Sequence, residues 1–150
     1  MAYGSGVDDA EARARAERTL TDGSALEAYE RWIAAQGGDP SETALPTAPV
    51  IREVRAEQDG HVARVGAIRV GHAALRLGAG RRTKEDTIDH AVGVVCLKKR
   101  GDRVGVGDTL AEVHARDEGA AAQGVREVRD AYELAADAPS PRRVVLDLIA

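Results

Sequence analysis

The sequence predicts an α+β fold, with a helical segment at the N-terminus and a domain of short strands and helices after it. Three observations support this prediction. Charge pairs and apolar residues recur at helical spacing before residue 37, short β-prone runs separated by glycine turns occupy residues 50 to 114, and an amphipathic helical pattern follows residue 118. At 150 residues with 43% hydrophobic content, the chain is long enough to bury a core.

A first short helix is predicted from Asp8 to Leu20. This stretch consists mainly of Ala, Arg and Glu, which favour helices. The pairs Asp9/Arg13 and Glu11/Arg15 place opposite charges about one turn apart, where they stabilise a helix. Because the apolar face consists only of alanine, we expect this helix to be exposed.

A second helix is predicted to begin at Ser24, because Ser24-Ala-Leu-Glu27 has the pattern of a capping box, and to stop at Gly37-Gly38. Its apolar residues recur at helical spacing: Ala25, Tyr29, Trp32 and Ile33. Large aromatic side chains on an otherwise polar helix need a covering surface. We expect that surface to belong to a domain outside this chain.

A linker punctuated by prolines runs from Asp39 to Pro49 and has neither helical nor strand periodicity. We therefore place a domain boundary near residue 48. Residues 1–48 are predicted to form a helical segment with its linker, and residues 49–150 a second domain.

The second domain is predicted to open with a β-hairpin. The β-prone runs Val50 to Ala56 and His61 to Val65 are joined through Asp59-Gly60, a dipeptide typical of two-residue hairpin turns. The apolar residues between 67 and 77 then repeat as on a short helix, which Gly78 would end.

Strands are predicted from Val92 to Leu97 and from Thr109 to His114, on either side of a turn-rich segment from Gly101 to Asp108. A helix is predicted from Glu118 to Ala136. Its apolar side chains recur in steps of four and three residues: Ala121, Val125, Val128 and Tyr132. The apolar run from Val144 to Ile149 predicts a closing strand.

Composition argues against several classes of function. A net charge of -4 argues against a nucleic-acid or anionic-membrane binder, which needs a surplus of Lys and Arg on one face. No apolar run approaches the roughly 20 residues that cross a bilayer. The single cysteine, Cys96, cannot form an internal disulfide, and we expect a cytoplasmic protein. The histidines lack the spacing of a metal site, so no metal ligand is predicted: His61, His72, His90 and His114.

The stretch Gly78-Ala-Gly80-Arg-Arg-Thr-Lys84 invites comparison with phosphate-binding loops, because glycines expose backbone N–H groups. The spacing argues against that interpretation, since a Walker loop needs Lys followed by Ser or Thr, and here Thr83 precedes Lys84. Thr83 also stands where a Rossmann fingerprint needs its third glycine. A helix stop with a solvated charged loop explains the glycines. It does not explain the fourteen residues from Gly78 to Ala91, and long loops are often functional.

Two other polar groups have plain interpretations. Asp86, Asp89 and His90 could form an acid/base set, but no nucleophile in a suitable context accompanies them, so we expect them to cap the loop. The run Lys98-Lys-Arg100 is interpreted as a solvated turn, with contact to an anionic partner as the lesser alternative.

Three short motifs occur in one order: Leu77-Gly-Ala-Gly-Arg81, Lys84-Glu-Asp86 and Ile88-Asp89. In this order and spacing the chain resembles the C-terminal region of the pyrimidine-nucleoside phosphorylases of the thymidine phosphorylase type. The resemblance implies a pentosyltransferase, a glycosyltransferase class, that performs reversible phosphorolysis of thymidine or uridine. The products are the free base and (deoxy)ribose 1-phosphate, and the enzyme is a homodimer.

The resemblance also implies an α/β-hammerhead (barrel-sandwich-hybrid-like) domain over about residues 50 to 114, with a C-terminal helix and strand packed against it. Residues 1–48 would be the tail end of an upstream α/β domain. No cofactor is implied, and phosphate acts as the co-substrate. We expect no nucleic-acid or membrane partner.

The family's phosphate-binding segment, its catalytic His and the residues that hold the base lie upstream of the matched region. No catalytic residue is therefore assigned here, and the isolated chain is expected to be inactive. The loop from Gly78 to Asp89 resembles the family segment that becomes ordered when the domains close. Its candidate closure residues are Gly78, Ala79, Gly80, Arg81, Lys84 and Asp86. We expect Met1 to mark a cloning boundary, a truncated gene or a misplaced initiation codon.

A stand-alone binding or carrier module is the alternative. Gly101-Asp-x-Val104 and Gly107-Asp-x-Leu110, with Asp59-Gly60 before them, resemble the half-motifs of biotinyl and lipoyl domains. Such carriers present a modified lysine on a hairpin, flanked by Met in the biotinyl case. Here Met1 is the only methionine, and Lys84 in Arg-Thr-Lys-Glu-Asp is the only lysine in a comparable turn. The carrier signature therefore fails at the position of its chemistry.

Overall fold

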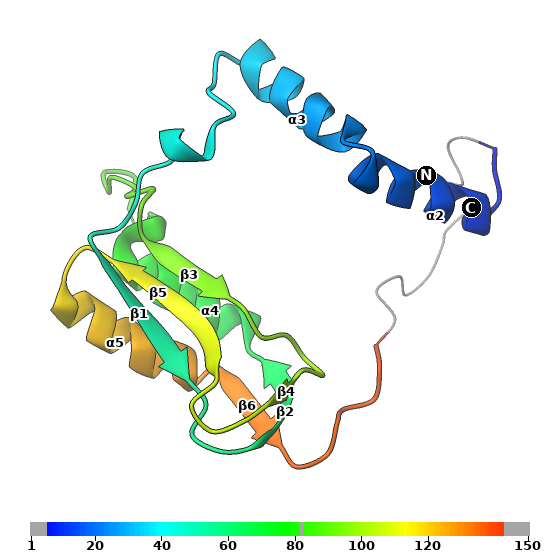
Figure 1. Ribbon diagram of the computed structural model, residues 1–150. Coiled ribbons are helices and arrows are strands. Elements are labelled where there is room, and N and C mark those ends of the chain that lie inside the picture. Colours follow the sequence, from blue (N-terminus) through cyan, green and yellow to red (C-terminus); the bar gives the residue numbers. More distant parts are fainter. Residues whose placement is uncertain (1–5, 82, 143–150) are drawn as a thin grey trace. The chain divides into compact units, whose positions relative to one another are not determined.

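The computed structural model describes residues 6–81 and 83–142, without the side chain of Glu42. The chain divides into two compact units, with the division between Leu45 and Pro46. The first unit is helical, and the second combines helices with antiparallel sheets (Figure 1). The predicted α+β class is confirmed. Among the described residues, no helix has both the length and the apolar character to span a bilayer.

Two helices form most of the first unit: α2 spans Asp9–Thr21 and α3 spans Ser24–Ala35. Asp8 caps α2, because its Oδ1 accepts a hydrogen bond from the backbone N–H of Glu11 at 2.8 Å. A short 3-10 helix, Glu42–Ala44, lies in the predicted linker.

The ion pairs on α2 differ from the prediction in one case. Glu11 and Arg15 pair, but Arg13 pairs with Glu17, at 2.9 Å, and not with Asp9. The longer side chain of Glu17 reaches the guanidinium one turn away. Asp9 lies in the first turn of α2, where the helix dipole favours its negative charge.

The start of α3 corrects the predicted capping box. Gly23, with φ of 85°, occupies the N-cap position, and Ser24 is already helical. Because this left-handed glycine joins the two helices, Ser24 lies one position too late to cap α3. Its backbone N–H donates instead to Oδ1 of Asp22 at 2.9 Å, and hydrogen bonds from Ser24 lower the pKa of Asp22. The helix stops at Ala35, before Gly37 with φ of 78°.

In the described part of the second unit, six strands form two three-stranded antiparallel sheets (Figure 1). The strand order is β1, β5, β3 in the first sheet and β4, β2, β6 in the second. The bounds are Val50–Arg55 for β1, Gly60–Val65 for β2, Gly93–Cys96 for β3, Arg103–Val104 for β4, Thr109–Ala115 for β5 and Tyr132–Ala135 for β6.

The predicted hairpin between β1 and β2 does not form, because these strands belong to different sheets. The Asp59-Gly60 dipeptide leads from one sheet to the other. Oδ1 of Asp59 accepts a hydrogen bond from the backbone N–H of Val106 at 2.8 Å. A Cβ on Gly60 would lie only 2.6 Å from the carbonyl oxygen of Ala135. Contacts distant in the sequence thus override the local preference for a turn.

Helix α4 spans Ala67–Ala74 and continues into a π-helical turn, Leu75–Ala79, in which Gly78 has φ of 110°. The helix predicted over residues 67 to 77, with its stop at Gly78, is confirmed. Helix α5 spans Glu118–Arg129. It packs against β1 and β5, while α4 packs against α5 and β3, so both helices cover the same face of the first sheet (Figure 1).

The core of the second unit lies between these helices and the sheets. Its largest fully buried side chains come from both sheets and from α5: Leu110, Val54, Val62, Val104, Val113 and Val128. Gly124 of α5 allows the helix to approach the first sheet, because a Cβ there would lie 2.8 Å from Cγ1 of Val113. The described residues thus place α5 close enough to bury β5.

Helix α5 ends at Arg129, earlier than predicted, and the residues after it form β6 against β2. Tyr132 leads this strand. Its hydroxyl oxygen lies 3.1 Å from the carbonyl oxygen of Lys98 and 3.0 Å from that of Leu110, so its one proton has an acceptor on either side. The helical spacing of Tyr132 is therefore misleading, because the partners of its hydroxyl, Lys98 and Leu110, lie far away in the sequence. The strand predicted from Val144 to Ile149 lies outside the described residues.

Candidate functional site

The glycine-rich loop connects the π-helical turn to β3, and its two ends are held together. The backbone N–H of Asp89 donates to the carbonyl oxygen of Gly78 at 3.0 Å. Oδ1 of Asp89 accepts a hydrogen bond from the N–H of Ala91, also at 3.0 Å. The positive φ of Gly78 favours glycine over every other residue, so the backbone itself requires glycine at this end of the loop.

The middle of the loop contains a small turn between Thr83 and Asp86. The N–H and hydroxyl of Thr83 donate to the two carboxylate oxygens of Asp86 at 3.2 and 2.9 Å. The N–H of Asp86 donates back to the carbonyl oxygen of Thr83 at 3.3 Å. The side chains of Arg81 and Lys84 are exposed, and no hydrogen bond or ion pair joins them to another residue that the structure describes. The loop thus presents two cations to solvent.

An open cleft of about 410 Å³ lies beside the loop, between the π-helical turn and the start of α5. It brings together three of the predicted closure residues: Gly78, Gly80 and Asp86. Ala79 packs against the hydrophobic core instead. Arg81 and Lys84 are not part of the cleft lining.

The structure adds Arg116 to this cleft, which sequence reasoning missed. Arg116 directly follows β5, and its Nη2 lies 3.4 Å from Oδ2 of Asp89. A Cβ on Gly78 would overlap the guanidinium of Arg116, so glycine is also needed to admit that side chain. The signal that could have found Arg116 is strand register. Once His114 of β5 is paired with Gly93 of β3, Arg116 is expected beside the end of the loop.

Arg76 also lines the cleft and links the π-helical turn to α5. Its Nε lies 2.8 Å from Oε1 and 2.9 Å from Oε2 of Glu127, and Gln123 donates to Glu127 at 3.0 Å. Burial alone would raise the pKa of Glu127, but the hydrogen bonds from Gln123 and Arg76 outweigh it and lower that pKa. Glu127 therefore stays charged and fixes this wall of the cleft.

The described lining of the cleft contains no His, Cys or Ser side chain, and its one hydroxyl group is that of Thr87. Both lining arginines already face carboxylates. Over the described residues, no group of three or more His, Cys, Asp or Glu side chains could hold a metal ion.

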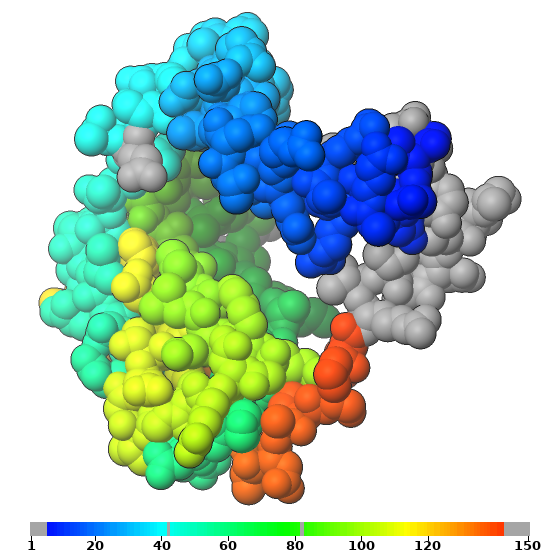
Figure 2. Space-filling view, turned by 45° about the vertical axis from the view of Figure 1, so that its right-hand side comes forward, coloured from blue at the N-terminus to red at the C-terminus, as the bar shows by residue number. Residues whose placement is uncertain are grey.

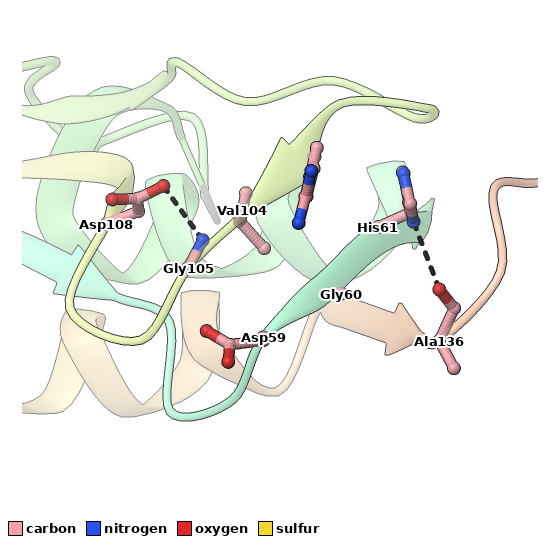
Figure 3. A pocket seen from close by; sticks show the side chains of 8 residues that line it. Asp59, Gly60, His61, Val104, Gly105, Asp108 and Ala136 are labelled. Atoms are coloured by element: carbon pink, nitrogen blue, oxygen red, sulfur yellow. Dashed lines mark hydrogen bonds between the residues drawn. The ribbon is translucent and has the colours of Figure 1, made fainter.

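A larger open pocket of about 710 Å³ lies on the second sheet and includes His61 and Arg103 in its lining (Figure 3). The acidic side chains of this pocket accept hydrogen bonds from backbone N–H groups. Oδ2 of Asp108 accepts the N–H of Gly105 at 2.9 Å, and Asp59 holds the same turn. Nδ1 of His61 lies 3.2 Å from a backbone carbonyl oxygen. Because these groups are used in turns, the size of the pocket does not by itself indicate a site.

The basic run Lys98-Lys-Arg100 belongs to the segment between β3 and β5, which forms much of the surface visible in Figure 2 (yellow-green). The N–H of Lys99 donates to Oδ2 of Asp102 at 2.7 Å, and Nη1 of Arg100 donates to the carbonyl oxygen of Ser140 at 2.7 Å. This run is therefore a turn held by its own residues and by the chain after β6.

The family model described as "Pyrimidine nucleoside phosphorylase C-terminal domain" matches residues 61–135. The pyrimidine-nucleoside phosphorylase of Geobacillus stearothermophilus is 47% identical over 112 residues, which cover 72% of this chain and 26% of the relative. That of Bacillus subtilis (strain 168) is 39% identical over 138 residues, which cover 89% of this chain and 32% of the relative. The chain thus spans about a quarter to a third of the length of these curated relatives.

Proposed function

From the premise that this chain belongs to the pyrimidine nucleoside phosphorylase C-terminal domain family, we propose that it is the closing part of a pyrimidine-nucleoside phosphorylase. The complete enzyme converts thymidine or uridine and phosphate reversibly into the free base and (deoxy)ribose 1-phosphate. It is a cytoplasmic homodimer without a cofactor. The observation that supports this proposal is the family match over residues 61–135, which runs from β2 to β6.

The proposal assigns no chemical step to this chain alone. The described lining of the cleft beside the loop contains no His, Cys or Ser side chain. The relatives are three to four times longer than the segments matched here, since those segments are 26% and 32% of their lengths. We assign the groups that contact phosphate and nucleoside to the part that this chain lacks, and we propose that the isolated chain is inactive.

The role proposed for the loop from Gly78 to Asp89 is to stabilise the closed state of the complete enzyme. Its ends are held together by the hydrogen bond between Asp89 and Gly78, while Arg81 and Lys84 remain exposed. Loops with this design commonly exclude water and complete a site without touching the reacting atoms.

The first unit supports the proposal of an upstream α/β domain as partner. Helix α3 has no buried residue, and its large apolar side chains are exposed, with Leu26 60%, Tyr29 47% and Trp32 61% accessible. Helices of this length are marginal in water unless they pack on another surface. We propose that the upstream domain covers these three side chains.

For the second unit we propose an α/β-hammerhead, barrel-sandwich-hybrid-like domain, which its two small antiparallel sheets support. The carrier module remains the alternative. A carrier needs its lysine on a tight hairpin between strands, whereas Lys84 lies in a loop between a helical turn and β3. A mass measurement of the chain from cells that shows a biotinyl or lipoyl adduct would favour the carrier.

The proposed function is tested by joining this chain to the part of the Bacillus subtilis relative that precedes the matched segment. The assay measures phosphate-dependent release of thymine from thymidine and of uracil from uridine. We expect release by the joined protein and none by the 150-residue chain. A folded joined protein without release would contradict the proposed function, and release by the chain alone would contradict the assignment of catalysis to the missing part.

A further inference from the structure

Three residues from three segments meet at the base of the loop: Gly78 lies in the π-helical turn, Asp89 precedes β3, and Arg116 follows β5. We call them the stem clasp. Nη2 of Arg116 lies 3.4 Å from Oδ2 of Asp89, and the N–H of Asp89 donates to the carbonyl oxygen of Gly78 at 3.0 Å. The clasp thus joins both ends of the loop to one cation.

Each carboxylate oxygen of Asp89 has its own contact. Oδ1 accepts the N–H of Ala91, while Oδ2 faces Arg116. The carboxylate therefore does more than shape a local turn, because only one of its oxygens serves the backbone of the loop. A purely local cap would not need a guanidinium from the end of β5.

The backbone of Arg116 is anchored, so its side chain can hold the loop in a fixed position. Ala115 before it is fully buried in the core, and Asp117 after it caps α5 by accepting the N–H of Ala120 at 2.8 Å. Its backbone is thus fixed on both sides. The side chain remains half exposed, and it reaches the loop through the space that Gly78 leaves free.

We propose that Arg116 is a positioning residue, which holds the stem of the loop against the first sheet so that Arg81 and Lys84 are presented in one place. The effect of Arg116 on catalysis rests on the proposed function, since only the complete enzyme has a partner for these cations. The effect of Arg116 on the loop does not rest on the proposed function, and it can be measured in this chain.

The test is amide hydrogen exchange of the 150-residue chain with Arg116→Gln. A half-exposed pair contributes modestly, so we expect the amides of residues 79–91 to exchange about two- to fivefold faster, while those of β1 and β5 are unchanged. Arg64→Gln is the matched control, because Arg64 pairs with Glu133 at 3.0 Å on the second sheet and is also exposed. It should leave residues 79–91 unchanged.

Arg116→Lys keeps the charge and should restore exchange to within about twofold of the original chain. Asp89→Asn keeps an acceptor for Ala91 but removes the charge, and should match Arg116→Gln. Unchanged loop exchange in both Arg116→Gln and Asp89→Asn would overturn the proposal. In the joined enzyme, Arg116→Gln should lower kcat while the melting temperature holds. An unchanged kcat with a faster-exchanging loop would overturn the catalytic consequence, whereas inactivity of the unsubstituted joined enzyme would count only against the proposed function.

Discussion

Replacing Gly78 with alanine tests the geometry of the loop stem. At φ of 110° and ψ of 7°, an alanine would occupy a sparsely populated backbone region, at a cost of about 1 to 3 kcal/mol. Its Cβ would also overlap the guanidinium of Arg116. Because that side chain is half exposed, it can move away, but it then loses its contact with Asp89, worth up to about 1 kcal/mol. We expect Gly78→Ala to lower the free energy of unfolding by about 2 to 3 kcal/mol.

The assay is urea unfolding followed by far-ultraviolet circular dichroism in a double-mutant cycle with Arg116→Ala. The backbone strain persists in either background, whereas the overlap exists only when Arg116 is present. The cost of Gly78→Ala should therefore fall by about 0.5 to 1 kcal/mol in the Arg116→Ala background. An equal cost in both backgrounds would refute the reasoning about the overlap, and a cost below about 0.5 kcal/mol would refute the reasoning about strain.

Gly71→Ala is the matched control for this cycle. Gly71 lies inside α4, has no positive φ, and a Cβ there would meet no atom within 4 Å. The same substitution should therefore stabilise the chain by about 0.5 to 1 kcal/mol, because alanine favours the helix. If the change in the free energy of unfolding has opposite signs at the two glycines, the effect at Gly78 comes from its special geometry and not from alanine in general.

Three further outcomes are expected. Gly124→Ala should destabilise the chain by about 1 kcal/mol in urea unfolding, because the steric overlap of its Cβ with the fully buried Val113 outweighs the gain in helix propensity. Stabilisation would contradict the packing of α5. Tyr132→Phe should cost about 1 kcal/mol, since its hydroxyl bonds to two carbonyl oxygens. Burial raises the pKa of Tyr132, so the neutral hydroxyl stabilises the fold below about pH 10 and this stability is lost above it. The difference in the free energy of unfolding between the original chain and Tyr132→Phe should therefore shrink between about pH 8 and about pH 11. A constant difference would count against the burial of the hydroxyl. The pKa of Glu127 is lowered, so the stability that its carboxylate contributes is present at neutral pH and lost as the pH falls through that pKa. Glu127→Gln should therefore flatten the dependence of the melting temperature on pH between about pH 6 and about pH 3. An unaltered dependence would argue against the pair with Arg76.

Local patterns in the sequence predicted several elements correctly. The helix around Trp32 and its stop at Gly37 follow from helical spacing and from glycine, and so does the end of the helical turn at Gly78. The strand from Thr109 was predicted from its β-prone residues because it is central and buried in the first sheet.

The predictions that failed depended on contacts between distant segments. Asp59-Gly60 has a hairpin sequence, yet the carboxylate of Asp59 binds the backbone of Val106 and the two flanking strands enter different sheets. Tyr132 has helical spacing, yet it begins strand β6, and its hydroxyl contacts the carbonyl oxygens of Lys98 and Leu110 from distant segments. No periodicity in a single segment contains this information.

The candidate site divides in the same way. The glycine-rich loop could be found because its glycines and its length are local properties of the sequence. Arg116 was missed, because its position depends on the register between β3 and β5 and on the space left by Gly78. Arg76 was missed for a similar reason, since its partner Glu127 lies on another helix.

We propose that this chain serves a phosphorylase through its exposed loop and not through reacting groups of its own. The most direct test is Arg81→Ala in the joined enzyme, with kcat/KM for phosphorolysis and the melting temperature measured on the same samples. We expect kcat/KM to fall by about tenfold, which is about 1.4 kcal/mol of transition-state stabilisation, while the melting temperature stays within about 1 °C, because Arg81 is exposed and has no partner among the described residues. An unchanged kcat/KM would contradict this proposal. So would a fall in kcat/KM that, expressed as free energy, is no larger than the loss in stability.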